Sequence, residues 1–180
     1  MHRIEAYIRL GIIFILGISI LYLPILFFLK KKGKSVTRQL SYIGLFCSLF
    51  LIIFATILFV PITFHPDTYL LNVQPFQWIG NMDSFQQFVV EKIPNILLFI
   101  PLGFFLPVVF QGKRRFYQTI FLSFGLTFGV EFFQYFIGRS ADIDDIIMNL
   151  LGAILGYVLF QFGHYLFQKQ MWWKQFLGSV

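Results

Sequence analysis

Seven polar residues are concentrated between positions 131 and 149, in a stretch otherwise rich in Phe, Ile and Leu. Ionisable groups in apolar surroundings are costly to bury unless they pair with one another or have a function. Four of the seven are carboxylates and one is an arginine, so some of the acid must be protonated, solvated, or matched by a cation or a basic ligand. The stretch is therefore the candidate functional site, and its polar members are Glu131, Gln134, Arg139, Asp142, Asp144, Asp145 and Asn149.

Paired carboxylates in unlike environments are one chemistry that this stretch offers. Glu131 lies deeper in the apolar sequence than Asp142 and Asp145, so these groups can hold different protonation states and act as acid and base. A nucleophile is not evident, because Ser140 has no histidine nearby and the chain has no G-x-S-x-G motif. If the protein is an enzyme, we expect Glu131, Asp142 and Asp145 to be catalytic.

Two other uses of the same residues stay open. Oxygen ligands would suit a divalent cation such as Mg²⁺ or Ca²⁺, although no cofactor is required, and zinc is not expected because the histidines lie far from the stretch. Alternatively, the polar groups only hold helices together. In that case Arg139 would pair with Asp142 or Asp145. Glu131 would then form a hydrogen bond with Asn149.

The composition of the chain indicates a membrane protein. Of its 180 residues 58% are hydrophobic and 12% are charged, and the mean hydropathy is +0.77. A soluble domain of this length would need far more charged surface. The net charge of +6 comes from short basic clusters between long apolar runs, which is typical of membrane topology and argues against nucleic acid as a partner. The single cysteine, Cys47, cannot form an internal disulfide.

Five apolar runs are long enough, at about 1.5 Å per residue, to cross a hydrocarbon core of about 30 Å. We predict an all-α polytopic membrane helical bundle of about five transmembrane helices plus an outer interfacial segment. We divide the chain into a first helix with a basic loop (1–39), a membrane domain (40–162) and a cytoplasmic or interfacial tail (163–180). The runs are 10–29, 40–62, 94–110, about 116–137 and about 143–162.

The distribution of Lys and Arg predicts the orientation of the chain. The loops 30–38 and 111–115 and the tail hold ten of the fourteen Lys and Arg residues, which favours their placement in the cytoplasm. We therefore expect the N-terminus outside and the C-terminus in the cytoplasm. The external segment 63–93 carries Trp78 and Phe85 among polar residues, so we expect an interfacial anchor there or a lid for a lipid substrate. Met171, Trp172 and Trp173 are expected to anchor the inner side.

Helical periodicity places the polar residues on two facing stripes. At 100° per residue, Glu131 and Gln134 share one face of the fourth run with Ser123 and Thr127. The fifth run carries its own stripe, and Asp144 points away from it. The members of that stripe are Asp142, Asp145, Asn149, Gly152 and Gly156.

An antiparallel hairpin that turns near Ser140 would bring these stripes together. It would place Glu131 at the depth of Asn149, Gln134 at that of Asp145, and Arg139 at that of Asp142, in a cleft open to the outside. Gly152 and Gly156 would let another helix approach closely. In the third run Asn95 is followed by Phe99 and Gly103 on one face, so Asn95 should enter at the same outer level, and Pro94 and Pro101 should bend or unwind the start of that helix.

The ordered combination of these motifs resembles the VanZ-like family of bacterial membrane proteins over roughly residues 40–160. It comprises NILLFIPLGFFLP from Asn95, EFFQ from Glu131, RSADIDDIIMNLLGAILG from Arg139, and the upstream NVQPF from Asn72, which is similar to the family's N-L-x-P-F element. EKIPN, residues 91–95, departs from the family pattern, which tends to place a second Asn or Gly just ahead of the motif Asn. The resemblance implies a bacterial cytoplasmic membrane protein of the cell envelope, associated with resistance to glycopeptide antibiotics of the teicoplanin type.

Three hypotheses about function follow. The first is a protein that binds or shields lipid-linked wall precursors or other membrane lipids, or binds the lipoglycopeptide antibiotic itself, with Asn95, Gln134, Arg139 and Asn149 as ligand-binding residues. The second is an intramembrane hydrolase or transferase on lipid-linked substrates. The third is an ion-coupled lipid transporter, although the polar residues stop in the outer half of the spans and line no inner pathway.

Overall fold

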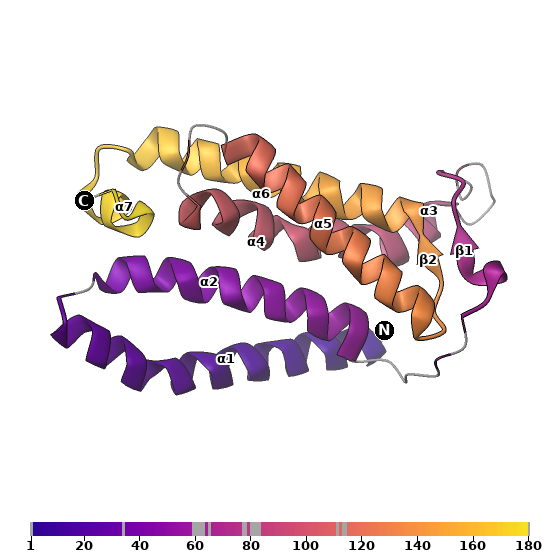
Figure 1. The fold of residues 1–180 in the computed structure, drawn as a ribbon, viewed down its shortest axis with the longest axis horizontal. Helices are drawn as coiled ribbons and strands as arrows, with labels where there is room; N and C mark the ends of the chain where they lie inside the picture. Colours follow the sequence, from indigo (N-terminus) through magenta and orange to yellow (C-terminus); the bar gives the residue numbers. More distant parts are fainter. Residues whose placement is uncertain are drawn as a thin grey trace.

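The chain folds into a bundle of long helices, whose arrangement Figure 1 shows. The structure is a computed structural model that describes residues 2–33, 35–58, 64, 66–76, 79, 84–110, 112 and 115–179. The elements are α1 (His2–Lys31), α2 (Val36–Ile53), the π-helix η1 (Phe54–Leu58), the 3-10 helix η2 (Thr68–Leu70), β1 (Leu71–Asn72), α3 (Ser84–Gln87), the π-helix η3 (Phe88–Lys92), α4 (Ile93–Val109), α5 (Arg115–Phe136), β2 (Ala141–Asp142), α6 (Ile143–Phe167) and α7 (Met171–Leu177).

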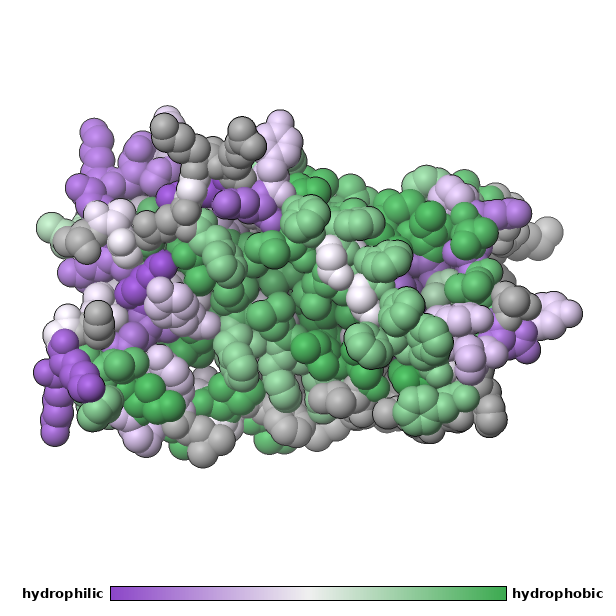
Figure 2. Space-filling model, viewed as in Figure 1, coloured by the Kyte–Doolittle hydropathy of each residue, from purple (hydrophilic) through white to green (hydrophobic). Residues whose placement is uncertain are grey.

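The predicted all-α membrane bundle is confirmed. Among the residues that the structure describes, four helical segments are long and apolar enough to cross a membrane, namely Val36–Ile57, Phe88–Val109, Arg115–Phe136 and Ile143–Phe167. They correspond to the second to fifth predicted runs, and α1 contains the whole of the first run. Figure 2 shows an apolar band across the middle of the molecule with hydrophilic residues gathered toward both ends. Large apolar side chains such as Phe121 and Phe132 are exposed along the bundle, as expected of surfaces that face lipid.

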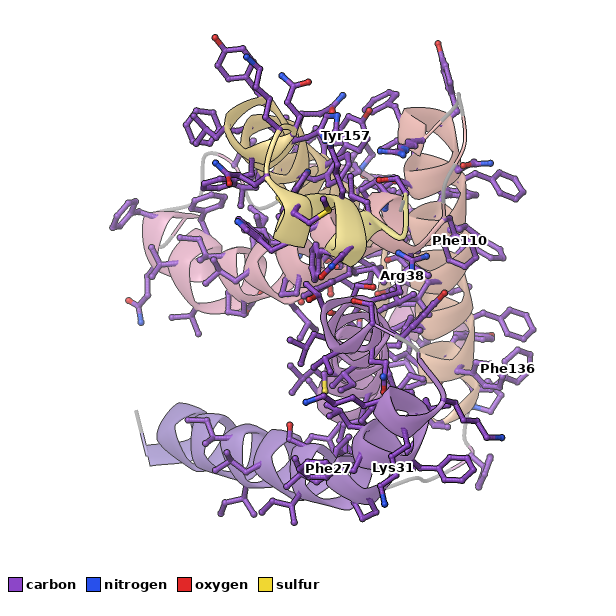
Figure 3. The ribbon with its side chains drawn as sticks, turned by 90° about the vertical axis from the view of Figure 1, so that its left-hand side faces the viewer. Phe27, Lys31, Arg38, Phe110, Phe136 and Tyr157 are labelled. Carbon is purple, nitrogen blue, oxygen red and sulfur yellow. The ribbon has the colours of Figure 1, made fainter. Side chains whose placement is uncertain are left out.

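Helix α4 forms the centre of the bundle. Its residues Phe99, Leu102 and Leu106 are buried against Ile52 of α2 and Val130 of α5. α1, in contrast, packs mainly against α2, and Figure 3 shows it set apart from the other helices. The π-helix η3 directly precedes α4, which agrees with the expected irregular start of that span.

Helices α4 and α6 approach each other backbone to backbone. A Cβ atom at Gly152 would overlap the carbonyl oxygen of Ile96, and one at Gly156 would overlap that of Ile100. From the other side, a Cβ atom at Gly103 would overlap the carbonyl oxygen of Ala153. The predicted close approach at Gly152 and Gly156 is therefore confirmed, with α4 as the partner helix.

The tail differs from the prediction at one tryptophan. Met171 and Trp172 are exposed, as an interfacial anchor requires, but Trp173 is buried and packs with Val108 and Phe160. The Trp173 indole Nε1 donates a hydrogen bond to Nδ1 of His164, 3.0 Å away. A buried indole N–H needs such a partner, so Trp173 belongs to the core that docks α7. In the external segment Phe85 is exposed, whereas Trp78 lies outside the described residues.

Candidate functional site

Lys92 is the cation at the centre of the polar stretch. Its Nζ lies 2.8 Å from Oδ2 of Asp142 and 2.9 Å from Oδ1 of Asp145. The Lys92 side chain is only 3% exposed, whereas the two carboxylates are 19% and 27% exposed. A buried ammonium is tolerated only when it is paired, and here two carboxylates share it. We call Lys92, Asp142 and Asp145 the Lys92 cluster.

The Lys92 cluster is positioned by α6 and by the last turn of η3. Asp142 is the N-cap of α6, and its Oδ1 accepts a hydrogen bond from the backbone N–H of Asp144 at 2.9 Å. The same oxygen accepts a bond of 3.1 Å from the side-chain amide of Asn72. Asn95, three residues after Lys92, hydrogen-bonds the carboxylate of Asp145. Both oxygens of Asp142 are thus engaged, and the expected position of Asn95 beside the site is confirmed.

Asp144 faces away from the Lys92 cluster, as predicted, and fixes the external segment. It is buried, and its two carboxylate oxygens accept hydrogen bonds from the backbone N–H of Phe76 at 2.9 and 3.1 Å. Phe76 has a φ of 62°, a left-handed conformation that is rare for a bulky residue and costs energy. The charge-assisted bond from Asp144 helps to offset that cost. Beside it, β1 pairs in parallel with β2, with Leu71 opposite Ala141 and Asn72 opposite Asp142.

Glu131 and Asn149 are both buried, but they bind different partners from those predicted. Oε2 of Glu131 accepts the backbone N–H of Asp142 at 2.9 Å. The amide of Asn149 donates to Oγ1 of Thr127 at 2.8 Å, one helical turn deeper on α5 than Glu131. The prediction that Glu131 and Asn149 lie at the same depth was wrong, because it assumed a tight turn between two uninterrupted helices.

The turn is longer because α5 ends in a glycine cap. Gly138 has a φ of 80°, and its N–H bonds to the carbonyl of Tyr135 while the N–H of Arg139 bonds to that of Gln134. This pair of bonds is the Schellman motif, which stops the helix and turns the chain. Residues 137–142 then run outside both helices, so the two helices are offset relative to a tight hairpin.

Arg139 does not pair with an aspartate among the described residues. The alternative in which the polar groups only hold helices together had predicted a pair with Asp142 or Asp145. Nη1 of Arg139 donates to the carbonyl oxygen of Thr56, and Nε2 of Gln134 donates to the same oxygen at 3.1 Å. Thr56 lies in the last turn of η1, where carbonyl groups lack partners within their own helix. Arg139 and Gln134 therefore attach α5 and its turn to the end of the second span rather than to the Lys92 cluster.

Of the seven predicted residues, the structure brings four together around Lys92, places a fifth one turn deeper and places the other two at a neighbouring contact. Glu131, Asp142, Asp145 and Asn95 lie in or directly against the Lys92 cluster, and Asn149 lies one turn deeper. Arg139 and Gln134 lie beside the site at Thr56. Within the described ranges no three His, Cys, Asp or Glu side chains are arranged to hold a metal ion.

Lys92 and Asn72 are members of the site that we did not predict from the sequence. Lys92 falls within the external segment 63–93, for which we expected an interfacial anchor or a lid. The excess of carboxylates over Arg139 required a cation, and Lys92 is three residues from Asn95, on the same side of the following helix. These two observations together could have identified it.

Comparison with known proteins identifies the family of the chain. The profile of the VanZ/LLP1 family matches residues 42–167, more than half of the chain. The chain belongs to the VanZ/LLP1 family. It is 32% identical over 129 residues to Protein VanZ of Enterococcus faecium, a match that covers 71% of this chain and 75% of that protein. No solved structure gives a significant match.

The region that matches the VanZ/LLP1 family contains every residue of the Lys92 cluster and its surroundings. It begins in α2 and ends at the last residue of α6, so it includes Thr56, the external segment and the α4–α6 contact. α1 and α7 lie outside it. In this VanZ/LLP1 protein, the polar site therefore lies entirely within the family region.

Proposed function

We propose that this VanZ/LLP1 membrane protein acts at the outer face of the cytoplasmic membrane, with its N-terminus outside and its C-terminus in the cytoplasm. In this proposal the Lys92 cluster binds the polar headgroup of a lipid-linked wall precursor or a related membrane lipid. By shielding that lipid, the protein lowers susceptibility to glycopeptide antibiotics of the teicoplanin type. The family membership supports a role of this kind, and the geometry of the site supports the binding step.

The partial exposure of the two aspartates is the observation that carries the proposal. Lys92 is buried, but Asp142 and Asp145 keep 19% and 27% of their side chains exposed. A purely structural ion pair between helices has no need of exposed carboxylate, because exposure weakens the attraction between the charges. The cluster also lies at the end of the bundle opposite the lysine-rich loop, where an outer-leaflet lipid would meet it (Figure 1).

The arrangement of charge indicates the type of ligand. A headgroup that carries an ammonium or amide group could bind the carboxylate oxygens of Asp145 while Lys92 holds the carboxylates in place. Glu131 fixes the backbone of Asp142 from below, so the position of the cluster is set before any ligand arrives. Asn95 and Asn72 contribute amide groups to the same surface.

The test combines drug susceptibility with binding. The protein is expressed in a teicoplanin-susceptible Gram-positive host, and the minimal inhibitory concentration of teicoplanin is measured for wild type, Asp145→Asn and Asp67→Asn. Asp67 is an exposed aspartate of the external segment, so Asp67→Asn makes the same chemical change outside the cluster. We expect wild type and Asp67→Asn to raise the inhibitory concentration and Asp145→Asn to lose this effect.

The same variants are then purified and tested for binding of a labelled undecaprenyl-linked wall precursor. We expect resistance and binding to fall together in Asp145→Asn. Binding that persists at the wild-type level while resistance vanishes would contradict the proposal. A wild-type protein that leaves the inhibitory concentration of the host unchanged would contradict it as well.

A second candidate function is an intramembrane hydrolase or transferase on lipid-linked substrates. The observation in its favour is that three carboxylates meet at one site, with buried Glu131 held by the N–H of Asp142 close to the partly exposed aspartates. This arrangement is one in which two acids can take different protonation states. Purified protein should then convert a labelled envelope lipid into a new product, and Glu131→Gln should abolish that product. No product from the wild-type protein, with or without Mg²⁺, would exclude this candidate.

A further inference from the structure

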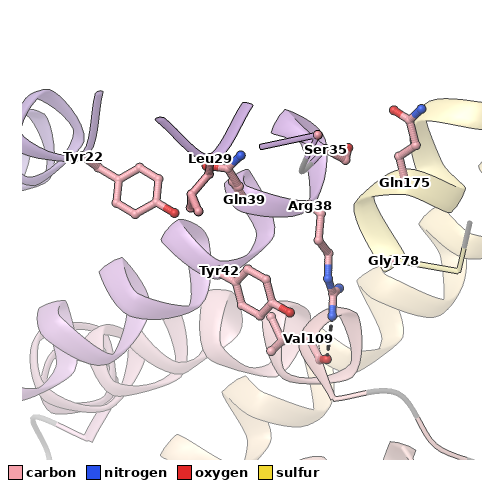
Figure 4. Close-up of a pocket in the computed structure, with 10 residues that line it drawn as sticks. Tyr22, Leu29, Ser35, Arg38, Gln39, Tyr42, Val109, Gln175 and Gly178 are labelled. Carbon is pink, nitrogen blue, oxygen red and sulfur yellow. Dashed lines mark hydrogen bonds between the residues drawn. The ribbon is translucent and has the colours of Figure 1, made fainter. Parts of the chain in front are cut away.

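A pocket lies at the end of the bundle opposite the Lys92 cluster. It has a volume of about 820 Å³ and is lined by residues of α1, α2, α7 and the end of α4 (Figure 4). The polar residues of its wall include Tyr22, Ser35, Arg38, Gln39 and Tyr42. We call it the Arg38 pocket, and it shares no residue with the proposed site.

Gln39 is the feature of this pocket that the fold does not explain. Its side chain is 4% exposed, and neither its Oε1 nor its Nε2 has a hydrogen-bond partner. A buried amide without partners costs about 1–3 kcal/mol, so native proteins seldom keep one without a use for it. Gln39 supplies both a donor and an acceptor at the pocket wall.

The charge of the Arg38 pocket is positive. Arg38 donates to the carbonyl oxygens of Val108 at 2.8 Å, Val109 at 3.0 Å and Phe176 at 3.2 Å, and no carboxylate pairs with it among the described residues. Lys30, Lys31 and Lys32 are exposed at the same end, and Figure 3 shows Lys31 and Arg38 on neighbouring elements of this end. The surroundings therefore favour an anion.

A second, apolar pocket continues from the first along the α1–α2 hairpin. Its volume is about 380 Å³, and its lining is Ile18, Tyr22, Tyr42, Ile43 and Phe46. Tyr22 and Tyr42 line both pockets, and Figure 4 shows both in the wall of the Arg38 pocket. A polar, cationic pocket that continues into an apolar one matches an amphiphile with an anionic head and a hydrocarbon chain.

We infer that the α1–α2 hairpin binds one anionic membrane phospholipid, with its phosphate headgroup in the Arg38 pocket and an acyl chain in the apolar pocket. Gln39 then bonds the glycerol or phosphate oxygens, and the lysines of the loop attract the negative charge. The ends of α1 and α2 that line the pocket lie at the left of Figure 1, and Figure 2, in the same view, shows hydrophilic residues gathered there beside the apolar band, as expected at the depth of a lipid headgroup. The site depends on neither the Lys92 cluster nor the proposed function.

The test measures thermal unfolding of the full chain, purified in a neutral detergent, with added phosphatidylglycerol, phosphatidylcholine or inorganic phosphate. A ligand that binds only the folded protein raises its melting temperature in proportion to affinity and concentration. We expect phosphatidylglycerol to raise the melting temperature clearly more than phosphatidylcholine, and inorganic phosphate to leave it unchanged. Equal effects of the two lipids would overturn the assignment of an anionic headgroup, and an equal effect of inorganic phosphate would show a free-anion site instead.

Two variants separate the polar and apolar parts of the site. Gln39→Leu removes the unpartnered amide, so we expect the lipid-free protein to be at least as stable as wild type while its affinity for phosphatidylglycerol falls about three- to tenfold. Ile43→Trp fills the apolar pocket and should weaken binding of the lipid as well. Gln168→Leu, which changes an exposed glutamine at the same end, is the matched control and should bind like wild type. Wild-type affinity in both pocket variants would refute the inference.

Discussion

The two ends of the bundle hold a cation in different ways, and Lys92 is buried whereas Arg38 is half-buried. At one end Lys92 is neutralised by two carboxylate side chains that come from β2 and α6. At the other end Arg38 donates to three backbone carbonyls at the ends of α4 and α7 and has no carboxylate partner among the described residues. Arg38 therefore caps two helices and leaves its end of the bundle positive, whereas the Lys92 cluster offers a ligand the negative charge of its partly exposed carboxylates.

This difference predicts that the two cations are not equally replaceable. Lys92→Met leaves Asp142 and Asp145 side by side without a cation, so the free energy of unfolding should fall by about 3–5 kcal/mol. Arg38→Met removes hydrogen bonds to neutral carbonyls and should cost about 1–3 kcal/mol. Thermal unfolding in detergent micelles measures both, and Lys174→Met, at an exposed lysine, is the control.

The double variant Lys92→Met with Asp145→Asn sharpens this prediction. Removing one of the two negative charges relieves their repulsion, so the double variant should be more stable than Lys92→Met alone. If Arg38→Met lowered the free energy of unfolding as much as Lys92→Met does, the distinction between the two ends would be contradicted.

The α4–α6 contact joins the two ends and allows a second test. Gly156→Ala places a methyl group against the Ile100 carbonyl and should lower the free energy of unfolding by about 1–3 kcal/mol. At Gly129 on α5, no described atom beyond the neighbouring residues and the nearby backbone of the helix itself lies within 4 Å of the new methyl group, so Gly129→Ala should be neutral or stabilise the helix by up to about 1 kcal/mol. Melting temperatures of the two variants give the comparison. Equal effects would mean that the backbone approach contributes nothing to stability.

The smallest expected effect concerns Asp144. Asp144→Asn keeps an acceptor for the N–H of Phe76 but loses the negative charge and one of the two oxygens, which should cost about 1 kcal/mol. Hydrogen exchange should become faster at residues 71–76 and stay unchanged at the Arg38 end. Faster exchange at both ends would show that the external segment supports the whole bundle rather than the Lys92 end alone.

The helices and the faces of the site could be predicted from the sequence because they follow from local patterns. Apolar runs located the spans, and helical periodicity correctly grouped Ser123, Thr127, Glu131 and Gln134, all of which are buried on α5. Helical periodicity also placed Asp144 and Asp145 on different faces of the fifth run. The four-residue spacing of Gly152 and Gly156 predicted that another helix packs closely against them.

The partners of the polar groups could not be predicted, because they depend on chain geometry between helices. The cap at Gly138 and the extended residues at β2 shifted α6 relative to α5, and this shift changed the partner of every polar group in the turn. Lys92 lies 50 residues from Asp142 in sequence, and Thr56 lies 83 residues from Arg139. Contacts over such distances carry no periodic signal in a single sequence.

The parallel pairing of β1 with β2 has a consequence for biogenesis. Two parallel strands cannot form a hairpin, and here α3, α4 and α5 lie between the two partners in the chain. Asn72 is therefore synthesised well before Asp142 and must wait for two membrane insertions before the strands can meet. During that interval β1 has no strand to pair with, and Asn72 lacks its bond to Asp142. We expect the Lys92 end to assemble last, so that defects there trap the nascent protein after its helices have inserted.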